Sequence, residues 1–345
     1  MGSSNNNEVI SKVSPHTVKK FELIEAYVSA WAHKLLEYGR NSGNCNGIVF
    51  IDCMCNSGVY VNEETGEIVE GTPIRVARIL SEVMREQNYQ NQFAKLYFND
   101  FSQEKIDELR KHLPPDTKNF HVSLSVGDGN DLIKSLGTKI STQDKTNYLL
   151  VYDPYQATID WYALLPFIRN WGEIILNHMV SDSVRAVSQA KSDAAVSKYE
   201  STYLANIKDL VAFGSDRTAF EQRIRDIINA LRGENGCQYY IASYPFFNSK
   251  NSVVYNLLHC TGNMAGFKLF KSTAWNTFGG KSSMKKTKLN PGQLAFDFSA
   301  KADELMMTTV TDDNCYYVQD IVKFIEGGFC WQGWRSIKGD LGGSR

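Results

Sequence analysis

The chain has 345 residues, of which 43% are hydrophobic, enough for one large domain with an insertion or a small appendage. The 37 basic residues balance 38 acidic ones, which excludes nucleic-acid binding through a global positive field and leaves only a local patch. The seven cysteines form no CxxC pair and lack histidines at zinc-ligand spacing, so we expect a reducing compartment and no structural metal. No apolar run approaches the roughly 18 residues that cross a bilayer, which predicts a cytoplasmic protein without a membrane partner.

Strands and helices are predicted in regular alternation through residue 180. Residues 1–15 are polar and expected to be disordered, and apolar residues at three- and four-residue steps then predict a helix from His16 to Tyr38. A hairpin-like excursion is predicted at 59–71, and Thr72-Pro73 begins the next helix. The predicted strands, with their turns, are IVFIDC, AKLYFND, HVSLSVGDGND, NYLLVYDPY and GEIILNHMV. This alternation predicts an α/β fold with a Rossmann-like, doubly wound, mostly parallel sheet.

The second half of the chain predicts additions to that sheet. Residues 181–235 are helical and charged, and we interpret them as an inserted helical subdomain or lid within a domain at 16–278. Two runs, CQYYIASYPFF and SVVYNLLHC, are expected to pair as an antiparallel edge. Residues 279–335 are expected to form a basic loop and a small C-terminal appendage of winged-helix-like form, followed by a tail at 336–345.

Four acids follow successive predicted strands. Ligands of open α/β sheets bind beyond the carboxyl ends of the strands, where the strand order reverses. Asp52 precedes Gly58 in a turn that could approach a ligand, Asp100 is placed for ribose hydroxyls, and Asp128 for the amine of an adenine. Each acid taken singly could equally be a cap or turn residue. Four at equivalent positions, including Asp153, favour one shared nucleoside ligand.

The segment Asp153-Pro154-Tyr155 is the candidate catalytic element. The Asp153 carboxylate and the Pro154 carbonyl could both accept hydrogen bonds from an amino group, while Tyr155 stacks on the ring that carries it. Such contacts would align the nitrogen with a methyl donor. The alternative is a strand-ending turn in which Tyr155 packs into the core.

Other candidate residues have two interpretations each. His259 could be a general base near the site or a buried histidine with its hydrogen bonds satisfied, and we favour the second. Cys53 and Cys55 are interpreted as small turn residues. A basic run could bind nucleic-acid phosphates or form a solvated loop, and it comprises Lys281, Lys285, Lys286 and Lys288.

Several motifs together resemble the three-Cys-motif partner (TcmP) protein family, which is similar to class I S-adenosylmethionine (SAM)-dependent methyltransferases. The resemblance covers most of the chain, and the motifs occur in the family's order. They are FELIEAYVSAW, IDCMCNSGVY, GTPIRVARIL, FND, VYDPYQ and HCTGNMAGFKLFKSTAW.

The resemblance implies SAM as cofactor and assigns its contacts. The family's first turn, D-x-F-A-G-x-G, corresponds here to contacts from Asp52, Asn56 and Gly58, with Asp100 at the ribose and Asp128 at the adenine. Cys53-Met54-Cys55 departs from that pattern, and an earlier glycine is lost. The family name also implies a protein partner encoded nearby.

We therefore expect a SAM-dependent methyltransferase that acts on an exocyclic amino group of a nucleic-acid base. A target in a duplex would have to be flipped out to reach the methyl group. The alternative, supported by the altered first turn, is a binding or assembly module with weak or no catalysis that works with a protein partner. NAD chemistry is disfavoured because GxGxxG is missing.

Overall fold

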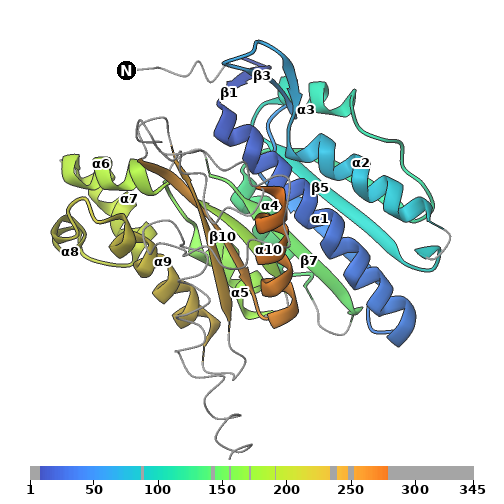
Figure 1. Cartoon of the computed structure of the whole chain (residues 1–345). Coiled ribbons are helices and arrows are strands. Elements are labelled where there is room, and N and C mark those ends of the chain that lie inside the picture. Colours follow the sequence, from blue (N-terminus) through green and yellow to red (C-terminus); the bar gives the residue numbers. More distant parts are fainter. Residues whose placement is uncertain are drawn as a thin grey trace, which may run out of the picture.

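The computed structural model describes residues 8–86, 89–140, 144–154, 157–170, 172–190, 192–233, 239–247 and 252–278. Tyr155, the basic run, the C-terminal appendage and the tail at 336–345 lie outside the described residues. Within them the chain forms a seven-stranded sheet with helices on both faces and a separate three-stranded sheet (Figure 1).

The large sheet has the strand order β6-β5-β2-β7-β8-β10-β9. Neighbours from β6 to β8 are parallel, whereas β10 runs antiparallel to both β8 and β9. All six residues of β2 are buried, as expected for a central strand covered on both faces. The strands are β2 Gly47–Asp52, β5 Phe93–Asp100, β6 Phe120–Val126, β7 Thr146–Tyr152, β8 Glu173–His178, β9 Tyr240–Phe247 and β10 Val253–Thr261.

This order gives the Rossmann-like, doubly wound fold and fixes its switch point. The chain proceeds from β2 outward to β5 and β6, then returns to place β7 and β8 on the other side of β2. The order therefore reverses between β2 and β7, and this is the position at which such sheets bind ligands. The predicted fold class, including the antiparallel pair near one edge, is confirmed.

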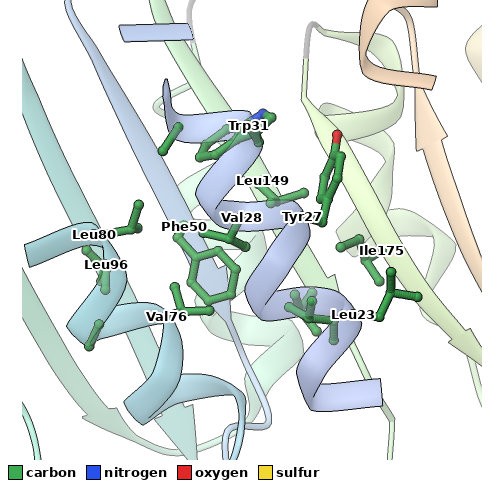
Figure 2. Close-up of a cluster of buried hydrophobic side chains, with 14 of the residues drawn as sticks. Leu23, Tyr27, Val28, Trp31, Phe50, Val76, Leu80, Leu96, Leu149 and Ile175 are labelled. Atoms are coloured by element: carbon green, nitrogen blue, oxygen red, sulfur yellow. The ribbon is translucent and has the colours of Figure 1, made fainter. Parts of the chain in front are cut away.

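One face of the sheet is covered by α1 Pro15–Ser42, α2 Thr72–Arg85, α3 Gln103–Arg110 and α10 Met264–Thr277. Tyr27, Val28 and Trp31 of α1 pack against Phe50 and Leu149 of the sheet (Figure 2). Each of these side chains is almost fully buried, which contributes about 1.5–3 kcal/mol apiece for the large apolar ones. α10, for which the sequence patterns gave no prediction, begins at a cap in which Asn263 accepts from the Ala265 amide.

The opposite face is covered by α4 and α5 and by a series of later helices. Phe220, Ile224 and Ile228 of α9 pack into this second core with Leu164 of α5. The segment interpreted as an inserted helical subdomain or lid forms α6 to α9 (Figure 1). It contributes buried side chains to the second core. The helices are α4 Gly129–Gly137, α5 Trp161–Arg169, α6 Val180–Gln189, α7 Asp193–Tyr203, α8 Ile207–Ala212 and α9 Arg217–Arg232.

The small sheet has the order β1-β3-β4, with β1 Ser11–Val13, β3 Val59–Asn62 and β4 Ile68–Glu70. The β3-β4 pair is the predicted hairpin. β1 corrects the expectation of disorder for the whole of 1–15, because Ser11–Val13 pairs in parallel with β3 through backbone hydrogen bonds that its polar composition did not reveal.

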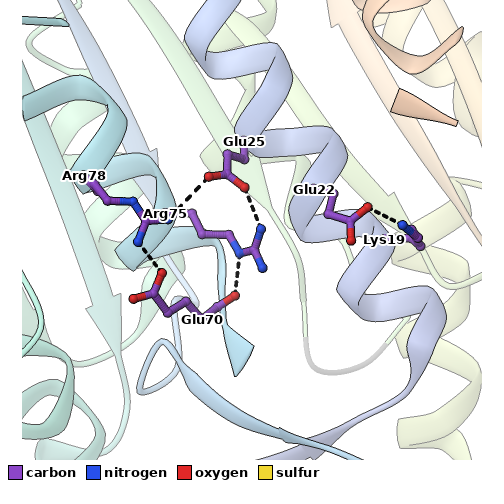
Figure 3. A network of polar contacts seen from close by, with 6 residues as sticks. All are labelled: Lys19, Glu22, Glu25, Glu70, Arg75 and Arg78. Carbon is purple, nitrogen blue, oxygen red and sulfur yellow. Dashed lines mark hydrogen bonds and ion pairs between the residues drawn. The ribbon is translucent and has the colours of Figure 1, made fainter. Parts of the chain in front are cut away.

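A polar network ties this hairpin to the helices (Figure 3). Arg75 of α2 pairs with Glu25 of α1 at 2.6 Å and donates to the Glu70 carbonyl oxygen at 2.6 Å. Arg78 pairs with the Glu70 carboxylate and approaches Glu25 at 3.5 Å. The network joins α1, α2 and β4, and α2 begins at the end of the sheet where the parallel strands terminate. None of the described helices is long and apolar enough to cross a membrane.

Candidate functional site

The turn after β2 and the start of α2 lie together although the hairpin separates them in sequence. The Gly71 amide donates to the Gly58 carbonyl at 2.7 Å, which closes the hairpin at its base. Gly58 has φ +71°, and a Cβ there would lie 2.9 Å from Ile74 and Leu109 side chains. Packing therefore explains this glycine, and a ligand contact through its backbone stays a prediction.

Asn99 holds the carboxyl ends of three strands together. Its Nδ2 donates to the Cys53 carbonyl at 3.2 Å and to the Gly127 carbonyl at 2.9 Å, while its own carbonyl accepts from the Cys55 amide at 2.9 Å. Ser125 Oγ donates to Asn99 Oδ1 at 2.8 Å. The sequence analysis missed this residue, and its position beside Asp100 was the only available signal.

Two of the predicted acids have local structural roles. Asp100 is 2% exposed, and its oxygens accept from the amides of Asn56 at 3.1 Å and Ser102 at 3.0 Å. Asp128 is exposed and caps α4 by accepting from the Asn130 amide at 2.8 Å. The structure thus gives both acids the turn and cap roles of the alternative interpretation, and their ribose and adenine contacts remain predictions.

Asp52 is the most perturbed acid of the site. It is 4% exposed at the end of β2, and its pKa is raised to about 7. Burial is the largest cause, and the nearby Asp153 and Asp100 add to it, whereas a hydrogen bond from the Met54 amide and the charge of Lys20 act in the opposite direction. An acid that is half-ionised near neutral pH is typical of functional sites.

Asp153 lies at the switch point, and each of its carboxylate oxygens already accepts one hydrogen bond. Lys20 of α1 forms an ion pair with its Oδ2 at 2.5 Å, and Asn177 at the end of β8 donates to its Oδ1 at 2.5 Å. The Lys20 side chain is 8% exposed and that of Asp153 is 32% exposed. The signal for Lys20 was present in the sequence, since it shares the apolar stripe of α1 with Leu23 and Tyr27.

Apolar side chains are exposed beside the acids. Phe101 directly follows Asp100 and is 61% exposed. Val126, which pairs with Asp100 across β5 and β6, is 44% exposed. An exposed aromatic ring and an aliphatic side chain at this edge provide contact area for the flat face of a base.

His259 does not belong to this site. β10 is antiparallel to β8, so His259 pairs with Ile175 near the amino end of β8, at the opposite edge from Asp153. Its ring is fully buried, bonds Glu173 through Nε2 at 2.8 Å and stacks on Phe270 at 4.6 Å. The interpretation as a buried histidine is confirmed, but its hydrogen bonds are only partly satisfied, because Nδ1 is buried without a partner among the described residues. A placement near Asp153 is wrong.

Cys53 and Cys55 are buried thiols of the turn. Burial raises their pKa well above the usual value, and the charge of Asp52 adds to this effect. They therefore stay protonated and unreactive at neutral pH. Over the described part of the chain, no three His, Cys, Asp or Glu side chains are grouped so that they could hold a metal ion.

No family model and no curated protein matches this sequence. Among solved structures, the chain is similar to human methyltransferase-like protein 13 in complex with SAH, at 10% identity and a TM-score of 0.33, over 81% of this chain and 97% of that one. It is also similar to a loganic acid methyltransferase with SAH, at 10% identity and a TM-score of 0.26, over 66% of this chain and 76% of that one. A geranyl diphosphate methyltransferase in complex with GPP and sinefungin matches at 13% identity and a TM-score of 0.23, over 68% of this chain and 78% of that one. At such TM-scores these likenesses carry no argument, and the fold assignment rests on the strand order described above.

Proposed function

We propose that the chain is a SAM-dependent methyltransferase of the class I type that binds its cofactor at the edge between β2 and β7. The observation that carries this proposal is the convergence of Asp52 and Asp153 at the switch point, beside Asp100 and the exposed ring of Phe101. Buried carboxylates favour a cation, and the aromatic ring favours a base. A nucleoside with a positively charged sulfonium combines both properties.

The residues present fit this cofactor. Asp128 is exposed and keeps acceptor capacity beyond its capping bond, as an adenine amine requires. Asn56, Gly58 and Asp100 form the turn expected to face the rest of the nucleoside. Asn177 Oδ1 is buried without a hydrogen-bond partner among the described residues, so an acceptor remains available beside Asp153.

For the reaction, we propose an exocyclic amine of a nucleic-acid base as acceptor. Bound SAM would supply the electrophilic methyl group. Asp153 and the Pro154 carbonyl would accept hydrogen bonds from the amine, with Tyr155 stacking on the base and Lys20 holding the Asp153 carboxylate in place. Because the edge is acidic, the phosphates would have to be held elsewhere, and this is the role proposed for Lys281, Lys285, Lys286 and Lys288.

The test is transfer of a tritiated methyl group onto separate DNA, RNA and protein fractions by the wild type and by Asp153→Ala. We expect label in a nucleic-acid fraction with the wild type and a loss of it with the variant. Label in protein alone would contradict the nucleic-acid acceptor while leaving methyl transfer intact.

A second candidate function is a binding or assembly module of TcmP type that acts with a protein partner in the cytoplasm. The observation in its favour is that both oxygens of Asp153 already have partners within the chain. Calorimetry with SAM distinguishes the two functions. A saturable heat that is lost in Asp100→Ala supports the enzyme, and the absence of heat at high SAM concentration supports the module.

A further inference from the structure

His16 is a partly exposed histidine at the end of the sheet where the parallel strands terminate. The chain has six histidines, and all six lie in the described residues. His178 also lies at this end, but it is 2% exposed and its Nε2 bonds the Tyr203 hydroxyl at 2.9 Å. The other four lie towards the amino ends of the parallel strands, and they are His33, His112, His121 and His259.

The position of His16 follows from that of Lys20. α1 begins beside the small sheet (Figure 1), and Lys20 in its second turn reaches Asp153 at 2.5 Å. Helical residues four apart share one face, so His16 lies on the same face as Lys20 and about 6 Å further towards the start of α1. This places His16 beyond the carboxyl ends of the strands, where ligands of open α/β sheets bind.

Contacts on both sides hold His16 in place. Before it, β1 pairs with β3, and its own carbonyl accepts from the Tyr255 hydroxyl at 3.2 Å. The centroid of the Tyr255 ring lies 5.7 Å from that of the imidazole and 5.4 Å from Lys20 Nζ. Burial and then the charge of Asp153 raise the pKa of Tyr255, so the aromatic ring that His16 contacts lies within electrostatic range of Asp153.

The imidazole has one bonded and one free ring nitrogen. Nε2 lies 2.8 Å from Ser14 Oγ, which is 3.1 Å from Thr17 Oγ1. When Nε2 donates to Ser14, the serine can donate to Thr17, and the lone pair of the ring is on Nδ1. Nδ1 has no hydrogen-bond partner within the described part of the chain. Burial and the charge of Lys20 lower the pKa of His16, so the ring is neutral near pH 7 and able to take up a proton.

We propose that His16 takes the proton that the acceptor amine loses on methyl transfer. The inference rests on the proposed function and adds a catalytic residue to it. The amine nitrogen forms the new C–N bond with its lone pair, and the electron pair of the broken C–S bond stays on sulfur, which becomes neutral. A proton of the methylated nitrogen then moves to Nδ1 of His16 and is released from there to solvent.

The acids of the site are poorly suited to this step. Each oxygen of Asp153 already accepts a hydrogen bond, from Lys20 or from Asn177. Asp52 and Asp100 are 4% and 2% exposed. An exposed carboxylate such as Asp128 has an ordinary pKa near 4, which makes it a weaker base than an imidazole.

The test is the single-turnover rate of transfer from tritiated SAM to the nucleic-acid fractions, with enzyme in excess, from about pH 5 to about pH 8. For the wild type we expect a rate that rises with pH through a step below 6.5, the ordinary pKa of the imidazole, because only the neutral ring accepts a proton. His16→Gln retains an amide donor for Ser14 but no base, so the rate should fall by about 100-fold and this step should disappear. The affinity for SAM, measured by calorimetry, should stay within about threefold of the wild type, because His16 acts on the acceptor.

Controls separate a base from a structural residue. His33→Gln makes the same change at an exposed histidine of the same helix and should keep the rate and the pH profile of the wild type. His16→Ala opens space beside Ser14, and added imidazole should restore part of its lost rate. Asp52, whose pKa is about 7, can add a second step to every profile, so only the step that is lost in His16→Gln belongs to His16.

The outcomes distinguish this inference from the proposed function. A wild-type rate without a step below 6.5, a wild-type rate and profile in His16→Gln, or a loss in His16→Ala that imidazole does not restore would each overturn the inference and leave the methyltransferase intact. If His16→Gln folds poorly, the wild-type profile and the imidazole response still decide. Absence of transfer by the wild type to any DNA, RNA or protein fraction would overturn the inference and the proposed function together.

Discussion

The sheet holds an acid with two side-chain donors at each end of its parallel strands, and the two acids differ in what surrounds them. At the amino end of β8, Glu173 accepts from the Tyr27 hydroxyl and from His259 Nε2. At the carboxyl end of β7, Asp153 accepts from Lys20 and Asn177. Glu173 lies beneath α10, where Phe270 stacks on His259, whereas Asp153 is partly exposed and lies near the uncompensated Asp52.

The two sites show how a buried charge that stabilises the fold differs from one that is suited to bind a ligand. Burial and the neighbouring Glu173 raise the pKa of Tyr27 well above its usual value, so its hydroxyl remains a donor to Glu173 at ordinary pH. Asp52, by contrast, accepts a hydrogen bond from the Met54 amide at 3.3 Å and shares the charge of Lys20 with Asp153. A buried acid held by two side-chain donors stabilises the fold, and a cluster with excess negative charge is suited to bind a ligand.

The largest loss of stability is expected from a change at Glu173, at the amino end of β8. Glu173→Ala should lower the free energy of unfolding by about 3–5 kcal/mol, because it leaves the Tyr27 hydroxyl and His259 Nε2 buried without their acceptor. Asp153→Ala should cost only about 1–2 kcal/mol, because Asp52 remains as a counter-charge for Lys20. Urea unfolding measures both, and equal losses would contradict the distinction between the two edges.

Asp52→Asn is expected to stabilise the protein. The folded-state pKa of about 7 lies above the ordinary 3.8, so the proton on Asp52 favours the folded state below about pH 4, and this contribution is lost as the pH rises through 7. The amide cannot ionise, so the variant should gain on the order of 2–4 kcal/mol over the wild type at about pH 8 and almost nothing near pH 4. Unfolding curves at the two pH values test this, and a gain that does not grow with pH would refute the buried ionisation.

Lys20→Met should destabilise the protein, in contrast to Asp52→Asn. It removes the cation that faces Asp153 and opposes the ionisation cost of Asp52, so we expect a loss of about 2–3 kcal/mol at about pH 8. The loss should be smaller near pH 5, where Asp52 is protonated. Methionine keeps most of the side-chain volume, and equal losses at both pH values would assign Lys20 to packing alone.

The smallest effect concerns Asp128, whose role in stability is local. Asp128→Ala should cost about 1 kcal/mol through loss of the cap on α4, whereas Asp128→Asn should change stability by only a few tenths, because asparagine caps helices equally well. Thermal unfolding of the pair provides the measurement. A marked loss in the asparagine variant would show that the charge of Asp128 belongs to the coupled acids after all.

The sequence by itself determined most of the helices and strands of this protein, with β1 and α10 as exceptions. Continuous apolar runs located the strands, and polar residues at their ends located the acids Asp52, Asp100, Asp128 and Asp153. Both signals are local. A strand that is buried on both faces needs an unbroken apolar run, and the chain becomes polar where that strand ends. The hairpin between β2 and α2 was predicted from a turn signal, Thr65-Gly66, between two short segments.

Only the tertiary structure decided which of those residues meet. Strand order brings Asp52 next to Asp153, the packing of α1 delivers Lys20 to both, and the reversed direction of β10 carries His259 to the opposite edge. No local pattern encodes these encounters, because they join segments that are distant in the sequence. The pKa of Asp52 depends on the sum of burial and of charges from three other elements, and that sum exists only once the sheet has assembled.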